Sequence, residues 1–243
     1  MLHILRKQII FLLIAYLCCT TVTAHAQFRQ WMNRPEHDNW PYYFGMSLAY
    51  NNSYIHTSKS TKFLQSDSIL YANPGSGSGI ALGLLATLKL TNRFELRANP
   101  QLIIGGARTF TYRLKYPALG EDSIMKQSLP STIVSFPFQI KFNSDRIRNF
   151  RTYLLAGVKY DIDLASNSAA RNAENLIKLK KYDASIDVGI GFNFYLPFVT
   201  LSPELRFSSG LMNIHSRDPN LKYSSVFDKL QSRMFFITLN LED

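Results

Sequence analysis

The sequence lacks long hydrophobic runs, which limits how the chain can cross a membrane. Its one sustained apolar run, residues 9–17, follows two basic residues and leads to Ala-His-Ala at residues 24–26. A basic start, a short apolar stretch and a small-x-small ending are the features of a cleaved secretory signal peptide. A membrane-spanning helix needs about 20 apolar residues. We therefore expect residues 1–26 to be a signal peptide and the exported chain to begin at Gln27.

Cysteine is also scarce. Both cysteines, Cys18 and Cys19, lie in the predicted signal peptide. Leu17 is a poor residue to precede a lipidated cysteine, so we favour ordinary cleavage over lipid attachment. The exported chain then contains no cysteine, which excludes a disulfide framework and cysteine chemistry even in an oxidising compartment.

Histidine is rare, and the motifs that could carry chemistry are weak. After residue 26 the sequence has only His37, His56 and His215. A lipid-modifying serine hydrolase would use His56 or His215, but no spacing ties either to a serine. The adjacent residues 36–38, Glu-His-Asp, rarely converge on one metal ion, and the Gly-Ser stretch 75–79 precedes no helix that could bind phosphate. We therefore expect no catalytic residue, no metal and no cofactor.

Acidic residues are fewer than basic ones. The chain has 27 Lys and Arg against 17 Asp and Glu, and removing the two basic residues of the signal peptide leaves 25 against 17, a net charge of +8. A basic protein suits polyanions, and an exported one meets lipid phosphates far more readily than nucleic acid. We therefore expect lipid partners and no nucleic acid.

The feature that recurs from end to end is alternation of apolar and polar residues. In RFELRANPQLII, residues 93–104, apolar residues occupy the even positions and polar residues most of the odd ones. A period of two over this length predicts a β-strand with one apolar face. Pro100 lies on the apolar row, and because proline has no N–H we expect a local bulge there. The pattern recurs in eight segments: residues 44–51, 80–90, 93–104, 132–142, 154–163, 182–194, 199–211 and 235–242.

The connections between these segments alternate in length. Residues 56–78, 107–130, 165–180 and 213–230 are long, whereas 91–92, 143–149 and 195–197 are short. Long extracellular loops that alternate with short periplasmic turns are typical of outer-membrane barrels. We therefore predict an all-β fold, an eight-stranded antiparallel up-and-down transmembrane β-barrel over residues 42–243. A short periplasmic arm, residues 27–41, would precede it, and both termini would be periplasmic.

The polar row decides which face of the strands points inward. A soluble lipocalin-like barrel would place the apolar row inside. Here the polar row is rich in small residues and its charges balance, six against six, as charges removed from bulk water require. Aromatic residues near the short turns also suggest an interfacial girdle: Trp40, Tyr42, Tyr43, Phe142, Phe150, Tyr195 and Phe198. We therefore predict a lumen charge network of Lys89, Arg93, Glu95, Arg97, Lys141, Lys159, Asp161, Asp163, Asp183, Asp187, Glu204 and Arg206.

An eight-stranded barrel has an interior just wide enough for its own side chains, so it is not a general pore. We expect function at the loops, turns, arm or outer wall. Arg146, Arg148 and Arg151 form a candidate periplasmic docking turn. Cations in the long loops suit the phosphates of outer-membrane lipid and glycolipid: Lys59, Lys62, Arg108, Arg113, Lys115, Lys126, Arg171, Lys178, Lys180, Lys181, Lys222 and Lys229.

Five stretches carry a resemblance to a known family: WPYYFGMSLAYNNSYIHT, RNFRTYLLAGVKYDIDLAS, NLIKLKKYDASIDVGIGFNFYL, LSPELRFSSGLMNI and SSVFDKLQSRMFFITL. They resemble the PorT (SprT) family of Bacteroidetes outer-membrane proteins, from about Asn39 to Glu242. The resemblance implies a part in the type IX secretion system, which exports proteins across the outer membrane and in some members supports gliding motility. It brings no catalytic residues.

Three functional hypotheses follow. The first is a non-enzymatic accessory or assembly component of type IX secretion that binds other secretion-system proteins and is not itself the translocation pore. The second is a stand-alone, OmpA-like structural or adhesive barrel. The third is the lipid-modifying hydrolase that would depend on His56 or His215.

Overall fold

The computed structural model describes residues 32–60, 69–116, 122–166, 177–216 and 227–243. The predicted signal peptide and the first residues of the predicted arm, 27–31, lie outside these ranges, as do Lys62, Arg171 and Lys222. Among the described residues, no helix is long and apolar enough to span a membrane. The one helical element in these ranges is a short 3-10 turn, η2 (Pro35–Asn39), directly before the first strand.

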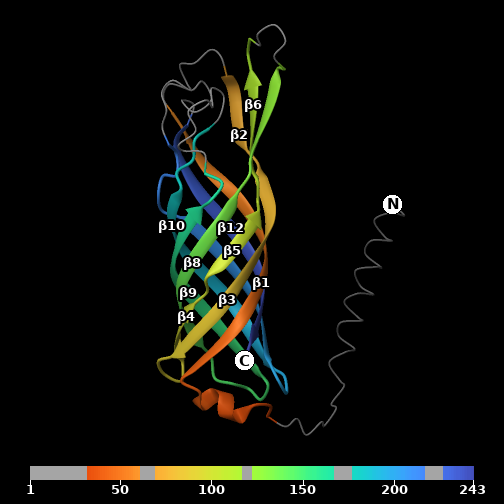
Figure 1. Ribbon diagram of the computed structural model, residues 1–243, viewed down its shortest axis with the longest axis vertical. Helices are drawn as coiled ribbons and strands as arrows, with labels where there is room; N and C mark the ends of the chain where they lie inside the picture. Colours follow the sequence, from red (N-terminus) through yellow and green to blue (C-terminus); the bar gives the residue numbers. More distant parts are fainter. Residues whose placement is uncertain (1–31, 61–68, 117–121, 167–176, 217–226) are drawn as a thin grey trace, which may run out of the picture. The chain divides into compact units, whose positions relative to one another are not determined.

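The main sheet closes into a ring of eight antiparallel positions, which we call staves because one of them consists of two short strands (Figure 1). The ring runs β1, β12, β11, β10, β9, β8, then β4 and β5 as one interrupted stave, then β3, which pairs with β1. Consecutive staves pair, which confirms the predicted up-and-down barrel. The bounds are β1 (Tyr42–Lys59), β3 (Ser76–Lys89), β4 (Phe94–Ala98), β5 (Gln101–Gly105), β8 (Thr132–Asn143), β9 (Phe150–Asp163), β10 (Tyr182–Tyr195), β11 (Thr200–Gly210) and β12 (Phe227–Glu242).

The wall of the barrel is apolar outside and polar inside. In β1, Met46 and Leu48 are exposed while Ser47 between them is buried. In β8, Ile140 is exposed while Gln139 and Lys141 are buried. Successive side chains of a strand point to opposite faces, so the alternation read from the sequence becomes an apolar exterior around a polar interior. This arrangement is the reverse of a lipocalin-like barrel.

The predicted bulge at Pro100 is absent. Leu102 pairs with Leu82 on β3 and Ala98 with Ala86, so the register is the same on both sides of the proline. The backbone N–H of Leu84 donates to the Pro100 carbonyl over 3.0 Å. The proline therefore removes one N–H without adding a residue, and it divides the stave into β4 and β5 without shifting it.

Part of the predicted long loops is instead a second sheet. β2 (Ile69–Pro74), β6 (Arg108–Leu114) and β7 (Ile124–Leu129) pair in the order β2-β6-β7 and extend beyond the main sheet (Figure 1). Their buried side chains join residues from the barrel's strand ends and loops in an apolar cap of Ile55, Ala72, Phe110, Tyr112, Leu114, Leu129, Ile177, Leu179, Ile214, Phe227 and Leu230. We call this the loop end of the barrel and the opposite end, which carries the short turns, the turn end.

Candidate functional site

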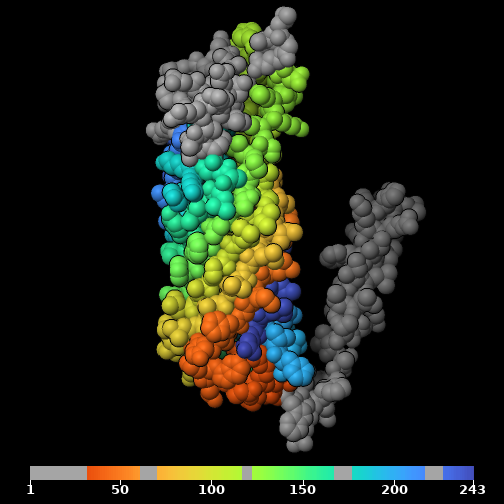
Figure 2. All heavy atoms as spheres, viewed as in Figure 1, coloured from red at the N-terminus to blue at the C-terminus, as the bar shows by residue number. Residues whose placement is uncertain are grey.

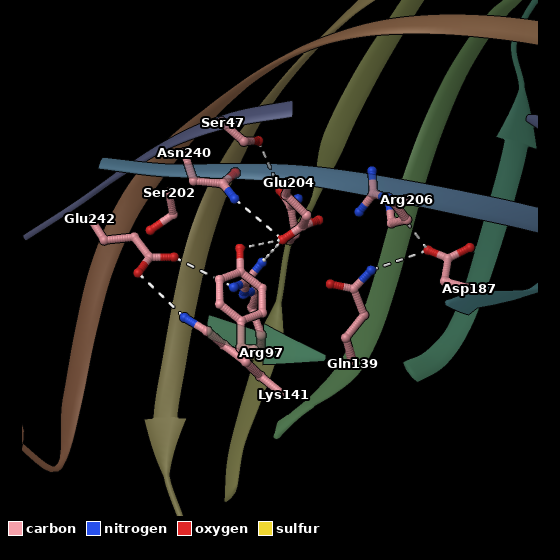
Figure 3. A network of polar contacts seen from close by, with 12 residues as sticks. Ser47, Arg97, Gln139, Lys141, Asp187, Ser202, Glu204, Arg206, Asn240 and Glu242 are labelled. Carbon is pink, nitrogen blue, oxygen red and sulfur yellow. Dashed lines mark hydrogen bonds and ion pairs between the residues drawn. The ribbon is translucent and has the colours of Figure 1, made fainter. Parts of the chain in front are cut away.

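The centre of the interior is an ion pair between Arg97 and Glu204. The guanidinium lies 2.6 Å from the Glu204 carboxylate, 3.5 Å from that of Glu242, and 5.3 Å from the ring centre of Tyr153 (Figure 3). The Tyr153 hydroxyl donates a hydrogen bond to Glu204 over 2.9 Å. Both charges of the closest pair are almost fully buried. Arg97 lies on β4 and Glu204 on β11, which are on separate parts of the ring. The ion pair therefore connects two strands that are not neighbours in the sheet.

A second cation, Lys141, extends the network toward the turn end. Its ammonium lies 3.6 Å from each of Glu95 and Glu242 and 4.1 Å from the ring centre of Tyr153. The Tyr43 hydroxyl donates to Glu95 over 2.8 Å. The opposite charges of the lysine and the two carboxylates offset part of the cost of removing them from water.

Toward the loop end, charges continue at a lower density. Asp187 accepts a hydrogen bond from Gln139 over 3.2 Å and lies 3.9 Å from Arg206 (Figure 3). The Lys159 ammonium lies 2.8 Å from Asp161. Side chains from every level are large and fully buried, so they fill the lumen. As a result, the described interior is a packed core that is largely polar, with an apolar cluster that includes Ile103, Ile133, Met234 and Phe236.

The structure buries ten of the twelve residues predicted for the lumen network: Glu95, Arg97, Lys141, Lys159, Asp161, Asp163, Asp183, Asp187, Glu204 and Arg206. Lys89 is half-buried at the turn end, where it donates to the Asp38 carbonyl. The prediction was wrong for Arg93. Its side chain is 58% exposed and pairs with Asp145 over 3.1 Å. β4 begins only at Phe94, so residue 93 lies in the turn, where strand alternation no longer applies.

Sequence reasoning missed several members of the network. Glu242 is buried between Arg97 and Lys141, a role that its place on the polar row of the last strand could have indicated. Arg108 is buried 3.6 Å from Asp163, but it lies in β6, where we expected a loop. Tyr43 and Tyr195 belong to the interior and not to the predicted girdle.

With these corrections the charges still balance. Among the described residues, seven buried bases match seven buried acids: Arg34, Arg97, Arg108, Lys141, Arg151, Lys159 and Arg206 against Glu95, Asp161, Asp163, Asp183, Asp187, Glu204 and Glu242.

The residues before β1 close the turn end. Asp38, on η2, lies 3.2 Å from Arg146 and 3.2 Å from Arg151. The Arg146 guanidinium stacks 3.6 Å above the ring of Tyr195 and also donates to the carbonyls of Asn33 and Arg34. We call residues 33–40 the turn-end segment. It is fastened to the barrel by charge-assisted hydrogen bonds, which are stronger than neutral ones.

His37 is the buried centre of this segment. Its ring lies 4.9 Å from that of Tyr43 and 5.7 Å from that of Tyr195, and its Nε2 is 2.9 Å from the Asp243 carbonyl oxygen. Burial, and then the positive charge of Arg34, lower the pKa of His37 below its ordinary value. The docked histidine is therefore neutral, since a charged ring would lose its hydration and face another cation.

The predicted docking turn is exposed only in part. The side chains of Arg146 and Arg151 pair with Asp38 of the turn-end segment, so of the three arginines of the candidate docking turn they are the two that this contact occupies. The sequence could not show this because their partner, Asp38, is more than a hundred residues away. Arg148 is exposed and has a left-handed backbone, φ 57°.

The described residues of the weaker motifs lie in different parts of the fold. His56 is exposed on β1, whereas His215 is buried at a bridge to Leu179, so the two histidines do not share a surface. The stretch 75–79 leads into β3 and not into a helix. Among the described residues, no group of three or more His, Cys, Asp or Glu is arranged to hold a metal ion.

An apolar outer wall around a polar, ion-paired interior is the architecture of an outer-membrane β-barrel. A family model described as "Outer membrane protein beta-barrel domain" matches residues 26–216. The chain belongs to this family. No curated protein matches the sequence.

Several solved structures are similar to the chain at low identity. Neisserial surface protein A is 13% identical, with 82% of this chain and 95% of that chain covered and a TM-score of 0.40. OprG from Pseudomonas aeruginosa is 16% identical, with coverage of 83% and 95% and a TM-score of 0.39. Ail of Yersinia pestis, solved with a heparin analogue, is 9% identical, with coverage of 84% and 100% and a TM-score of 0.37.

The central ion pair yields a stability prediction. Replacing Glu204 by Gln leaves Arg97 buried without its nearest carboxylate, and breaking a buried pair costs about 3–5 kcal/mol. We expect Glu204→Gln to lower the free energy of unfolding by about that amount, measured by urea unfolding in liposomes. The double variant Arg97→Gln with Glu204→Gln should recover part of the loss, because neither charge is then left alone.

The matched control is the exposed pair of Arg93 and Asp145, where Arg93→Gln should cost about 0–1 kcal/mol. If Glu204→Gln cost no more than Arg93→Gln, the ion pair would not be the main link between the walls.

His37 yields a pH prediction. Its pKa is lowered in the docked segment and returns to about 6.5 when the segment is released. Docking is therefore fully stabilised above pH ~6.5, and this contribution is lost as the pH falls toward the lowered pKa. Protease cleavage within residues 33–40 should accelerate between neutral and mildly acidic pH. In His37→Gln the cleavage rate should lose most of this pH dependence, and an unchanged profile would contradict the assignment.

Proposed function

We propose that the chain is a non-enzymatic outer-membrane barrel that acts as an accessory or assembly component of type IX protein secretion. The observation that carries the proposal is the filled interior. Arg97, Lys141 and Tyr153 occupy its centre, the turn-end segment covers one end and the apolar cap lies at the other. A barrel filled in this way does not conduct a polypeptide, so a part in secretion would be exercised beside a larger pore. The resemblance to the PorT (SprT) family supports that part.

The proposed arrangement is a signal peptide over residues 1–26, an arm over 27–41 and a barrel over 42–243. The short turns and both termini would be periplasmic, and the loop end would be extracellular. In this orientation the loop cations, such as Arg113 and Lys126, would meet the phosphates of outer-membrane glycolipid.

Arg146 and Arg151 contact the turn-end segment. Docking to other secretion-system proteins would therefore use the side chains of the turns that remain exposed. Ile147 is 71% exposed and Phe198 is 92% exposed, and Arg148 lies beside Ile147. Large apolar side chains at the tips of turns are suited to a partner's surface, because aromatic and aliphatic anchors beside an arginine are typical of protein interfaces. An OmpA-like stand-alone barrel and a lipid-modifying hydrolase are the alternative functions.

Removing the gene should abolish or strongly reduce export of type IX cargo, because the machinery would lack an assembly component. Restoring the gene should restore export, whereas Ile147→Ser with Phe198→Ser should restore it poorly and reduce co-purification of secretion subunits. Val158→Ser, on the outer wall, is the matched control. Heat-modifiable mobility on gels checks that each variant still forms a barrel. Normal export without the gene would overturn the secretion role and favour the stand-alone barrel.

A further inference from the structure

Two hollows have neighbouring linings near the turn end of the barrel. The first, of about 320 Å³, is at the rim and is lined by Trp40, Pro41, Tyr42, Tyr43, Phe44 and Asp243. The Asp243 side chain is 76% exposed, and its nearest cation, Arg34, is 3.5 Å away. The Asp243 backbone N–H donates to the Phe44 carbonyl over 2.8 Å, which holds residue 243 at the end of β12 beside β1.

The second hollow, of about 620 Å³, lies in the apolar wall and crosses the seam between β3 and the β4–β5 stave. Leu84 and Pro100 form a hydrogen-bonded pair there, and because proline has no N–H, the Leu84 carbonyl lacks the donor that another residue at position 100 would supply. Small and branched side chains form the lining: Met46, Leu48, Leu82, Leu84, Pro100, Leu102, Val134, Leu239 and Leu241, with Ser47, Gly83 and Gln101 behind them.

The linings of the two hollows are neighbours along β1 and β12. Met46 pairs with Leu241 and Leu48 with Leu239, while the next pair toward the rim is Phe44 with Asp243. Figure 2 shows the end of β12, in dark blue, beside the first residues of β1, in orange. From Phe44 to Leu48 the strand extends about 13 Å along its own axis. With the ~40° tilt of barrel strands this is about 10 Å of membrane depth, which lies within the ~15 Å of one leaflet's hydrocarbon. The pair of Asp243 and Arg34 at the rim thus lies next to an apolar track within one leaflet.

We propose that the two hollows form one binding site for a phospholipid with an ammonium headgroup, of the ethanolamine class. The ammonium lies against the Asp243 carboxylate and the rings of Trp40 and Tyr42, and one acyl chain follows Met46 and Leu84 over the Pro100 seam. The site rests on the barrel's membrane placement and not on the secretion role.

The rim selects the headgroup by charge. The exposed Asp243 carboxylate attracts an ammonium, in competition with Arg34, which pairs with this carboxylate and lies 5.4 Å from the centre of the Trp40 ring. The ring of Tyr42 adds cation–π attraction. A glycerol headgroup, which has phosphate but no cation, gains neither contact. The acyl hollow does not distinguish the two lipids. Any difference in their retention is therefore due to the contacts at the rim.

The test is native mass spectrometry of the mature barrel in detergent with added phosphatidylethanolamine or phosphatidylglycerol of identical acyl chains. We expect one ethanolamine lipid to be retained in preference to the glycerol lipid. Asp243→Asn should lower its retention about fivefold, the value of a partly exposed ion pair. Asp145→Asn, which removes another exposed carboxylate at the turn end, should leave retention unchanged.

The acyl hollow is tested by filling it. Leu102→Trp should lower retention of both lipids, whereas Val158→Trp, on β9 across the ring from β1, should not. Leu102→Phe repeats the test with a smaller side chain, and heat-modifiable mobility checks folding. Equal retention of the two lipids by the unmodified barrel, or equal effects of Asp243→Asn and Asp145→Asn, would overturn the headgroup assignment. Equal effects of the two tryptophans would overturn the acyl site.

Discussion

The structure depends on the pairing of charges inside a space too narrow for bulk water. A carboxylate or guanidinium taken out of water is costly unless an opposite charge and hydrogen bonds replace its hydration. Arg97 meets Glu204 at 2.6 Å, and Lys141 lies between Glu95 and Glu242. The contacts of Arg97 with Glu204 and of Lys141 with Glu242 join strands on separate parts of the ring, whereas Lys141 and Glu95 are partners on adjacent strands. The alternating sequence can therefore put its apolar row outside, against lipid, because opposite charges on the inward row lie close to one another.

The same pairing closes the barrel at the turn end. Asp38 supplies a carboxylate to Arg146 and Arg151, and neutral His37 fills the space between aromatic rings. At the loop end the solution is apolar, since Phe110, Tyr112 and their neighbours form a small core. In the proposed function, this filled interior does not pass a polypeptide, and contacts with partners would use the exposed turn tips, the loop sheet and the outer wall.

Sequence periodicity predicted the eight staves, their order and the inward polar row, because a period of two is a local property of strands. Alternation stops where strands stop, so it misplaced Arg93, and it gave no sign of Arg108 in the loop sheet. The bulge at Pro100 was wrong because proline removes a donor without requiring an extra residue. The burial of Arg146 depends on a contact with a distant segment, which no local pattern reveals.

The central claim is that the interior is a packed, closed core. The most direct measurement is the conductance of the purified mature protein in planar bilayers. The account predicts no stable conductance steps, and none when residues 33–40 are also deleted, because Arg97, Lys141 and Glu204 fill the lumen above that segment. Stable, ion-selective steps in the unmodified protein would contradict it.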